Sequence, residues 1–319
     1  MPERSSADAR RHALVKEGIA RAEKASSDRG YVEVLRSHVL AAMPVALGGA
    51  NARSLGLRPK EKKPRGPRLM DDPRYLANVR ELARKTKRNA RIIGGSVVAG
   101  KEFADCVAVG DDDEWGCTGT LIAPDAVLTA GHCKKLHTRI FVGNDVDGRG
   151  REYRVSRHVR HPGWTGKYAN DLMLLILEKP VSGVKPRHLA SGEMIDGAKD
   201  ARAVGFGTTD LAGTVGYGRK LQVDVPIVSV ACKGKVNGRK DGTVYGCHVG
   251  NEIVAGKPFL NRDTCRGDSG GPLYVADRGT WLLAGVTSRG TDAGTTICGD
   301  GGIYTRVDRY QAWITSVLG

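Results

Sequence analysis

Apolar residues in this 319-residue chain come in short runs, and this limits what the chain can fold into. Runs such as 126–128, 172–177 and 281–286 have the length of a β-strand and are bounded by Gly, Pro, Asp or Lys. The 43 glycines supply turns between them. From residue 92 onwards the sequence predicts an all-β body that ends in one helix, over 307–318. Because no run reaches the roughly 20 apolar residues of a membrane-spanning helix, no membrane span is expected.

Residues 1–91 differ from the rest in charge. They hold 22 Lys and Arg against 10 Asp and Glu, whereas residues 92–319 hold 28 against 25. We interpret 1–91 as a basic, partly helical leader or prosegment with a Pro-rich linker over 57–70, and 92–319 as a separate domain. An excess of 12 positive charges could bind nucleic acid or another anionic surface. The leader has no interleaved aromatic residues, however, so nucleic-acid binding is not expected and a solvated, protease-sensitive segment is the preferred interpretation.

A secretion signal is not evident at Met1, because no short basic region precedes an apolar core there. A weaker, signal-like pattern lies inside the leader, over 36–52. It combines Arg36, an apolar stretch over 39–47 and a small-x-small sequence at 50–52. Either the true start lies downstream of Met1, or these residues belong to a helical prosegment.

The sequence Thr-Cys-Arg-Gly-Asp-Ser-Gly-Gly-Pro over 264–272 indicates chemistry by a serine nucleophile. A hydroxyl needs a neighbouring base and donors for the oxyanion that forms when it attacks a carbonyl. The glycines allow tight backbone conformations that leave Ser269 accessible. On its own this segment is also compatible with a Gly-rich surface turn.

Two further segments supply the partners that a serine nucleophile requires. His132 follows the apolar run 126–130, and Asp171 directly precedes the apolar run 172–177, which we expect to be a buried strand. Each alone is more often a packing or turn residue. The order His, Asp, Ser and the spacing of these segments resemble those of the trypsin-like (chymotrypsin-fold) serine endopeptidases, over about residues 92–319.

The resemblance implies two antiparallel six-stranded β-barrels with the active site between them and a C-terminal helix after them. His132, Asp171 and Ser269 would form the catalytic triad, and the backbone N–H groups of Gly267 and Ser269 would form the oxyanion hole. A substrate pocket selective for Arg or Lys is implied, because an acid is expected at its base. Its residues would be Asp263, Ser288, Gly290 and Gly302. No cofactor and no metal are implied.

The seven cysteines lie in the second part of the chain, and six of them alone permit 15 pairings. The resemblance implies disulfides Cys117–Cys133, Cys232–Cys247 and Cys265–Cys298. Such bonds imply an oxidising, extracytoplasmic compartment, and hence a secreted protein. Cys106 is left over, and we interpret it as a small buried hydrophobic residue.

The sequence Arg91-Ile92-Ile93-Gly94-Gly95 resembles a zymogen junction. Cleavage after Arg91, by another protease or by the enzyme itself, would free the Ile92 amine to pair with Asp268.

Two residues depart from the family pattern: Arg289 replaces the aromatic residue beside the pocket mouth, and Arg266 stands just before Gly267. These guanidinium groups would either favour acidic residues in the substrate or pair with Asp292 and Asp300.

The sequence therefore predicts a secreted, trypsin-like endopeptidase made as a zymogen, with proteins or peptides as substrates. Two alternatives remain. One is a catalytically silent protease homologue that acts as an adaptor, which the complete set of triad residues argues against. The other adds a role for the leader in binding a nucleic acid or an anionic surface that localises the enzyme.

Overall fold

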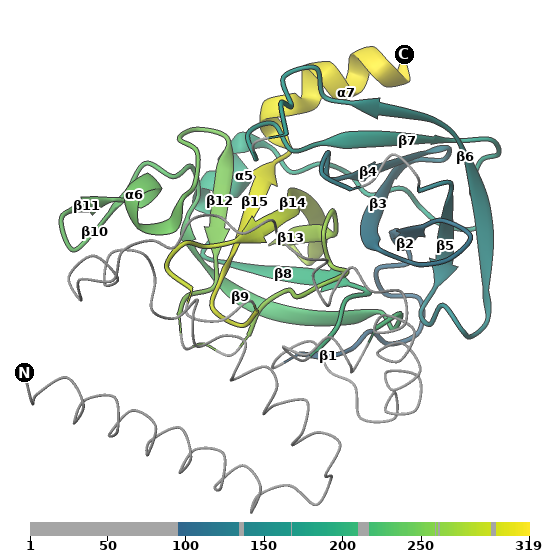
Figure 1. Cartoon of the computed structure of the whole chain (residues 1–319), viewed down its shortest axis with the longest axis horizontal. Coiled ribbons are helices and arrows are strands. Elements are labelled where there is room, and N and C mark those ends of the chain that lie inside the picture. Colours follow the sequence, from purple (N-terminus) through teal and green to yellow (C-terminus); the bar gives the residue numbers. More distant parts are fainter. Residues whose placement is uncertain are drawn as a thin grey trace, which may run out of the picture. The chain divides into compact units, whose positions relative to one another are not determined.

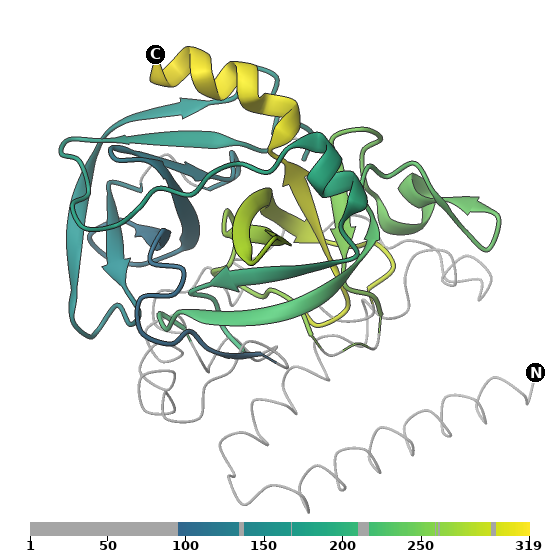
Figure 2. The same cartoon turned by 180° about the vertical axis from the view of Figure 1, so that it is seen from behind.

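The structure is a computed structural model that describes residues 95–133, 137–166, 168–209, 217–258, 260, 262–294 and 298–319. The leader 1–91, with the signal-like stretch 36–52 and the linker 57–70, lies outside the described residues, as do Arg91 and Ile92. The described part consists mainly of two β-barrels that lie side by side (Figures 1 and 2).

The first barrel is closed and antiparallel, with the strand order β2-β3-β4-β7-β6-β5. Its strands are β2 Cys106–Gly110, β3 Cys117–Ala123, β4 Ala126–Thr129, β5 Arg139–Gly143, β6 Gly150–Arg160 and β7 Met173–Leu177. Strands β2 and β4 are buried at every position, which explains why their sequences read as continuous apolar runs rather than as an alternation. The longer strand β6 is largely exposed and carries most of its charged residues outward.

The second barrel has the order β9-β12-β15-β14-β13-β8 and closes through pairing of β8 with β9. A short strand, β1 Ser96–Val97, adds to the outer side of β9. The strands of the barrel are β8 Asp200–Gly205, β9 Leu221–Ser229, β12 Glu252–Ala255, β13 Pro272–Asp277, β14 Thr280–Gly290 and β15 Gly302–Arg306. The prediction of two six-stranded antiparallel barrels is thus confirmed.

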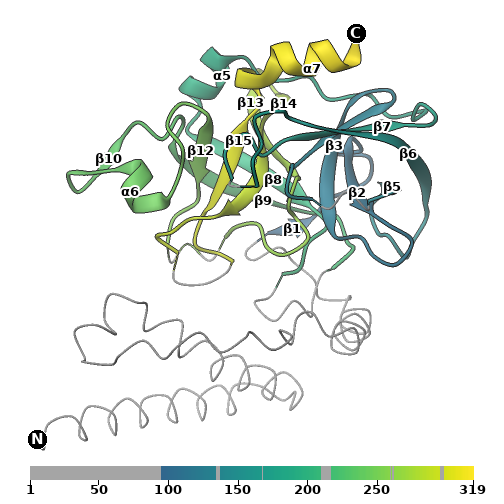
Figure 3. The same ribbon diagram turned by 45° about the horizontal axis from the view of Figure 1, so that its top comes forward.

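Short helices and one hairpin complete the second half of the chain (Figure 3). Helix α5, Gly192–Gly197, begins at Ser191, whose hydroxyl caps the Met194 N–H. The remaining elements are β10 Lys235–Val236, β11 Arg239–Lys240, α6 Asp241–Tyr245, the 3₁₀ helix η3 Asp308–Tyr310 and α7 Gln311–Leu318. The expected C-terminal helix is therefore present, with its first turn in the 3₁₀ form. Within the described part, no helix has the length and apolar character needed to cross a membrane.

Three disulfides join Cys117 to Cys133, Cys232 to Cys247 and Cys265 to Cys298, the same pairs as the resemblance implies. Cys106 is a free thiol with no solvent exposure, as expected for a small core residue. Burial raises the pKa of this thiol far above its ordinary value, so it is not a reactive nucleophile.

A buried polar cluster lies beside Cys106. Asp105 accepts hydrogen bonds from Arg187 Nε at 3.0 Å and from the Tyr274 hydroxyl at 2.6 Å. The fully buried Lys220 donates from Nζ to the carbonyl of Phe103 at 2.9 Å. Asp105 immediately precedes β2 of the first barrel and Tyr274 lies on β13 of the second, so this cluster ties the two barrels together by charge-assisted bonds.

Candidate active site

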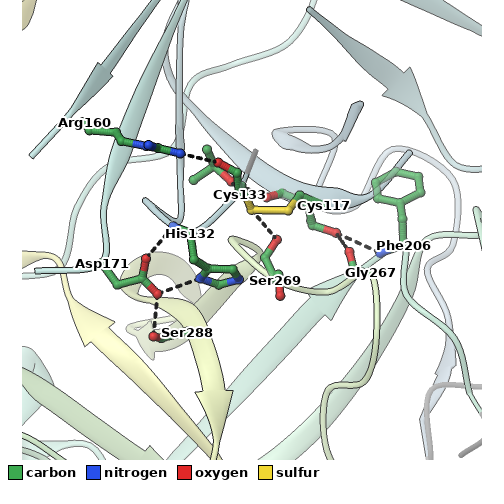
Figure 4. Close-up of a disulfide and its surroundings, with 11 residues drawn as sticks. Cys117, His132, Cys133, Arg160, Asp171, Phe206, Gly267, Ser269 and Ser288 are labelled. Carbon is green, nitrogen blue, oxygen red and sulfur yellow. Dashed lines mark hydrogen bonds and ion pairs between the residues drawn. A yellow bond between two sulfur atoms is a disulfide. The ribbon is translucent and has the colours of Figure 1, made fainter. Parts of the chain in front are cut away.

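The loop after β4 and the turn before β7 bring His132 and Asp171 into direct contact. His132 Nδ1 lies 2.7 Å from Asp171 Oδ2, and the backbone N–H of His132 donates to Asp171 Oδ1 at 2.8 Å (Figure 4). The Ser288 hydroxyl donates to Asp171 Oδ2 at 2.6 Å. Asp171 is fully buried, while the His132 side chain is 32% exposed. The carboxylate therefore fixes the imidazole ring through Nδ1, and Nε2 is the nitrogen left to exchange a proton.

Gly131 explains how the histidine loop can approach Asp171 so closely. A Cβ at this position would lie 3.2 Å from both the backbone nitrogen and the carbonyl oxygen of Leu172 and 3.2 Å from the Trp164 ring. These distances are shorter than ordinary van der Waals contacts, and two of them are to backbone that cannot easily move. Glycine at 131 therefore lets the loop pack directly on the start of β7.

The serine turn is held next to the histidine loop by bonds from the first barrel. The backbone N–H of Thr118, in β3, donates to the carbonyl of Ser269 at 2.8 Å, and the Thr118 hydroxyl donates to the carbonyl of Gly267 at 2.8 Å. The disulfide sulfur of Cys133, the neighbour of His132, lies 3.7 Å from the Ser269 carbonyl oxygen. Figure 4 shows His132 and Ser269 in this arrangement around the Cys117–Cys133 disulfide.

Further backbone bonds fix the same turn from the second barrel. Gly270 donates to the carbonyl of Thr287 at 2.8 Å, and Thr287 donates to the carbonyl of Gly271 at 2.9 Å. Gly267 has φ +94°, a conformation that residues with a side chain rarely adopt. A Cβ there would also lie 2.9 Å from Gly207 Cα. The turn thus requires glycine at 267 for its conformation and for its close approach to Gly207.

Asp268 points away from solvent and is fully buried. Its carboxylate accepts backbone N–H bonds from Gly207 to Oδ1 and from Cys265 to Oδ2, each at 2.8 Å. Burial raises its pKa to about 6, although these two hydrogen bonds act in the opposite direction. Gly205 and Gly207 make room for it, because a Cβ on either would lie less than 2.7 Å from Asp268 Oδ1 or Cγ.

The residues expected to form the substrate pocket lie together. Gly290 on β14 pairs with Gly302 on β15, and a Cβ at Gly302 would lie 3.3 Å from Asp263 Oδ1. Asp263 is 3% exposed and accepts hydrogen bonds from the hydroxyls of Thr264 and Tyr304, each at 3.3 Å. Burial raises the pKa of Asp263 to about 7. A buried carboxylate beside two glycines is an environment that a cationic side chain would stabilise.

Arg289 does not pair with Asp292 or Asp300, in contrast to one of the two expectations from the sequence. Its guanidinium makes two bonds of 2.8 Å with the carboxylate of Glu252 and one of 2.8 Å with the carbonyl of Gly246. It also lies 4.7 Å from the ring centroid of Tyr168, over the ring face. Glu252 is 2% exposed and balances the charge of Arg289. We therefore expect Arg289 to attract acidic side chains of a substrate only weakly. Arg266 is exposed.

Glu252 and Tyr168 were not expected at this site from the sequence. Glu252 is the first residue of β12 and lies 37 positions before Arg289, and nothing in its local sequence marks it. Tyr168 is 55% exposed, and its position three residues before Asp171 was the only available signal. Both residues contact Arg289, which is adjacent to Ser288 in β14.

The buried Arg289–Glu252 pair leads to a stability prediction. Glu252→Gln is expected to lower the free energy of unfolding by about 3–5 kcal/mol, because the guanidinium keeps little access to water after its carboxylate partner is lost. Glu152→Gln is the matched control. Glu152 pairs with Arg139 at 2.7 Å but is 49% exposed, so its loss is expected to cost less than about 1 kcal/mol. Urea unfolding with the disulfides intact measures both, and equal losses would contradict the buried-pair interpretation.

Two barrels with a hydrogen-bonded Asp-His pair and a glycine-rich serine turn between them define a protein of the chymotrypsin fold. Comparison of the sequence with known proteins agrees, since the family model Trypsin matches residues 92–314. The chain therefore belongs to the trypsin family of serine proteases. It is 32% identical to kallikrein-7 of Homo sapiens over 249 residues, which covers 75% of this chain and 91% of that protein. It is 28% identical to chymotrypsin-like elastase family member 1 of Felis catus over 251 residues, or 72% and 90% of the two chains.

Proposed function

We propose that this protein is a secreted serine endopeptidase that hydrolyses peptide bonds after Arg or Lys and is made as a zymogen. The observation that carries the proposal is the hydrogen-bonded series Ser288, Asp171 and His132 next to Ser269, with the buried Asp263 in the neighbouring pocket. The three disulfides support an oxidising, extracytoplasmic location. Proteins or peptides are the substrates.

In the proposed mechanism the substrate's basic side chain pairs with Asp263, which places the scissile carbonyl against Ser269. His132 accepts the Ser269 hydroxyl proton on Nε2 while Asp171, bonded to Nδ1, stabilises the imidazolium. The serine oxygen attacks the carbonyl carbon, and the N–H groups of Gly267 and Ser269 stabilise the oxyanion. Each such donor contributes roughly 3–4 kcal/mol in comparable sites.

Collapse of this tetrahedral intermediate breaks the peptide bond. His132 gives its proton to the leaving amine, and the acyl group remains on Ser269. Water then attacks the ester while His132 accepts a proton from it. The bond between the acyl carbon and the Ser269 oxygen breaks, His132 returns the proton to that oxygen, and the acid product leaves. Ser288 holds Asp171 throughout by its 2.6 Å hydrogen bond.

Labelling of the protein with a fluorophosphonate after confirmed cleavage at Arg91, together with cleavage of a peptide library, tests this function. Such a reagent forms a covalent bond only with an activated serine, and we expect one labelled residue, Ser269, and cleavage after Arg and Lys. A silent homologue would stay unlabelled. A labelled enzyme that cleaves mainly after aromatic residues would retain the protease function but remove Asp263 from the pocket.

Activation is the second part of the proposal. The family match begins at residue 92, which is the N-terminus that cleavage after Arg91 would create. We propose that 1–91 is the prosegment and that 92–319 is the protease domain. The freed Ile92 amine would pair with Asp268, whose buried carboxylate adjoins the oxyanion turn. Because the pocket itself would accept Arg91, the protease that activates the chain is either another enzyme or the protein itself.

This activation leads to a prediction about pH and Asp268. The α-amino group of a free chain titrates near pH 8, and pairing with a carboxylate moves this titration to higher pH. The amine is therefore fully charged for this pairing below about pH 8, and the pairing is lost as the pH rises through the shifted value. We expect the cleaved enzyme to lose activity on the alkaline side while its barrels stay folded, and Asp268→Asn to be folded but nearly inactive at every pH.

Asp241→Asn is the matched control for Asp268→Asn. Asp241 is also buried and also accepts a backbone N–H bond, from Gly234 at 2.8 Å, but it lies in the Cys232–Cys247 loop. Activity assays after confirmed cleavage at Arg91, with circular dichroism as the measure of folding, separate the two variants. A fully active Asp268→Asn enzyme would show that this ion pair is not the switch.

A further inference from the structure

The loop closed by the Cys232–Cys247 disulfide is unusually basic. Between the two cysteines it carries Lys233, Lys235, Arg239 and Lys240 and a single acid, Asp241. The β10–β11 hairpin and helix α6 form this loop, which projects from the second barrel beside β12 (Figure 1). The disulfide, the hairpin and the buried Asp241 constrain the backbone of this loop.

A cavity of about 560 Å³ lies between this loop, the end of β9, and the segments around α5 and η3. Its apolar floor includes Ile227, Val228 and Val236, and Val228 is 37% exposed. Four cations surround this floor: Lys199, Lys233, Lys235 and Arg309. A lining that combines apolar side chains with several cations fits a ligand that is both apolar and anionic.

The acids near the cavity do not balance these cations. Asp196 pairs with the buried Arg306 at 2.7 Å, and Asp241 is turned toward the Gly234 N–H. The three lysines are exposed, and none forms an ion pair within the part of the chain that the structure describes. Arg309 lies 3.4 Å from Asp308, whose two oxygens already bond Arg306.

The charge of the domain also singles out this cavity. Residues 92–319 carry a net charge of only +3, from 28 Lys and Arg against 25 Asp and Glu. Four cations around one cavity are therefore a local concentration and not a property of the whole surface. The leader of the same chain carries an excess of 12 positive charges and lacks the acidic character that these cations would select.

We propose that this cavity binds an acidic peptide segment that carries an apolar side chain, such as a Phe flanked by Glu and Asp. The carboxylates would pair with Lys199, Lys233, Lys235 and Arg309, and the apolar side chain would cover Val228. A sulfated polysaccharide would satisfy the cations but leave the apolar floor exposed, so the mixed lining favours a peptide. This inference goes beyond the protease function and does not depend on it.

The same loop also reaches the catalytic cleft. Its residue Gly246 accepts the hydrogen bond from Arg289, and the Tyr245 carbonyl accepts one from the Asp292 N–H at 2.9 Å. One disulfide-closed loop therefore lines the cavity with its first half and bonds Arg289 and Asp292 with its last residues. A protein bound at the cavity through an acidic segment would be held near the residues that line the cleft.

Photo-crosslinking on the full-length Ser269→Ala protein tests the proposal without catalysis. The probe is a short peptide of Glu and Asp around a benzophenone-bearing Phe, with no Arg or Lys that could enter the Asp263 pocket. We expect crosslinks within 227–241, mapped by mass spectrometry, and a Kd by fluorescence anisotropy that rises with salt. Mapping the crosslinks distinguishes this cavity from the basic leader, which is present in the same molecule.

Paired charge reversals provide the matched comparison. Lys233→Glu/Lys235→Glu is expected to raise the Kd at least about tenfold and to remove the 227–241 crosslinks. Lys179→Glu/Lys185→Glu makes the same change in net charge at exposed positions after β7 and is expected to change the Kd less than twofold.

Either of two results would overturn the proposal. Crosslinks only within 1–91, or crosslinks unaffected by the loop variant, would mean that the cavity is not the site. Equal affinity for a peptide in which Ser replaces the Phe, together with tight competition by a heparin fragment, would assign the cavity to a polysaccharide. Both results leave the test of Ser269 with a fluorophosphonate unchanged.

Discussion

Ser269→Ala is expected to lower kcat about a million-fold, roughly 8 kcal/mol in the activation free energy, because the members of a triad act as a unit. Alanine removes the attacking oxygen, and the His132–Asp171 pair then has no hydroxyl to activate. The serine turn should keep its conformation, since its bonds to Thr118 and Thr287 come from the backbone at 269–271. Hydrolysis of an Arg-containing peptide, after confirmed cleavage at Arg91, measures the effect.

Ser182→Ala is the control for this substitution. Ser182 is exposed, and its hydroxyl accepts a hydrogen bond from Arg151 at 2.8 Å. Neither of these two residues belongs to the proposed triad. The activity of Ser182→Ala is expected to match that of the unmodified enzyme. Residual activity of Ser269→Ala within tenfold of the unmodified enzyme would contradict the assignment of the nucleophile.

Asp263→Ser is expected to lower kcat/KM for Arg and Lys peptides about a thousand-fold or more. Removing the buried partner of a charge costs about 2–5 kcal/mol or more, and a thousand-fold loss corresponds to about 4 kcal/mol because the substrate's cation is left without a counter-charge. The loss should be confined to basic substrates, so that discrimination between Arg and an uncharged residue falls by several orders of magnitude. Kinetics on paired peptides that differ only in the residue before the cleaved bond measure this directly.

The pH dependence offers an independent measure of the same pocket. Burial raises the pKa of Asp263 to about 7, so below this pH the empty pocket gains a proton and loses its charge. The kcat/KM for Arg peptides should therefore fall as the pH drops through about 7. Asp263→Ser should lose this part of the decrease. An unchanged preference for Arg and Lys in this variant would show that Asp263 does not contact the substrate.

Much of the catalytic geometry could be anticipated because the relevant residues stand in recognisable local sequences. His132, Asp171 and Ser269 each follow or precede a short buried run, and a strand end is a defined place in a barrel. Asp171 contacts Ser288 and Gly302 lies next to Asp263, while the roles of these residues in catalysis and substrate binding stay predictions. Residues 1–92 were interpreted from composition and motif alone, and their roles stay predictions.

The polar interior could not be anticipated in the same way. Glu252 reads as an ordinary exposed acid, and only the folded chain brings it to Arg289 from 37 residues away. Lys220 has no exposed surface and reaches the Phe103 carbonyl across 117 residues, and burial lowers its pKa. Such pairings depend on which strands become neighbours, and local periodicity carries no information about them. The Asp105, Arg187 and Tyr274 cluster was missed for the same reason.

The way in which the serine turn is held has a consequence for how this family can change over time. Thr118, Gly270 and Thr287 fix the turn through backbone N–H and C=O groups, which every non-proline residue possesses. Mutations in the surrounding strands can therefore accumulate without displacing Ser269, provided that the few glycines and the disulfides are kept. The place of Ser269 is thus set mainly by the path of the main chain, so a substitution in the surrounding strands that keeps this path is expected to keep the nucleophile in position.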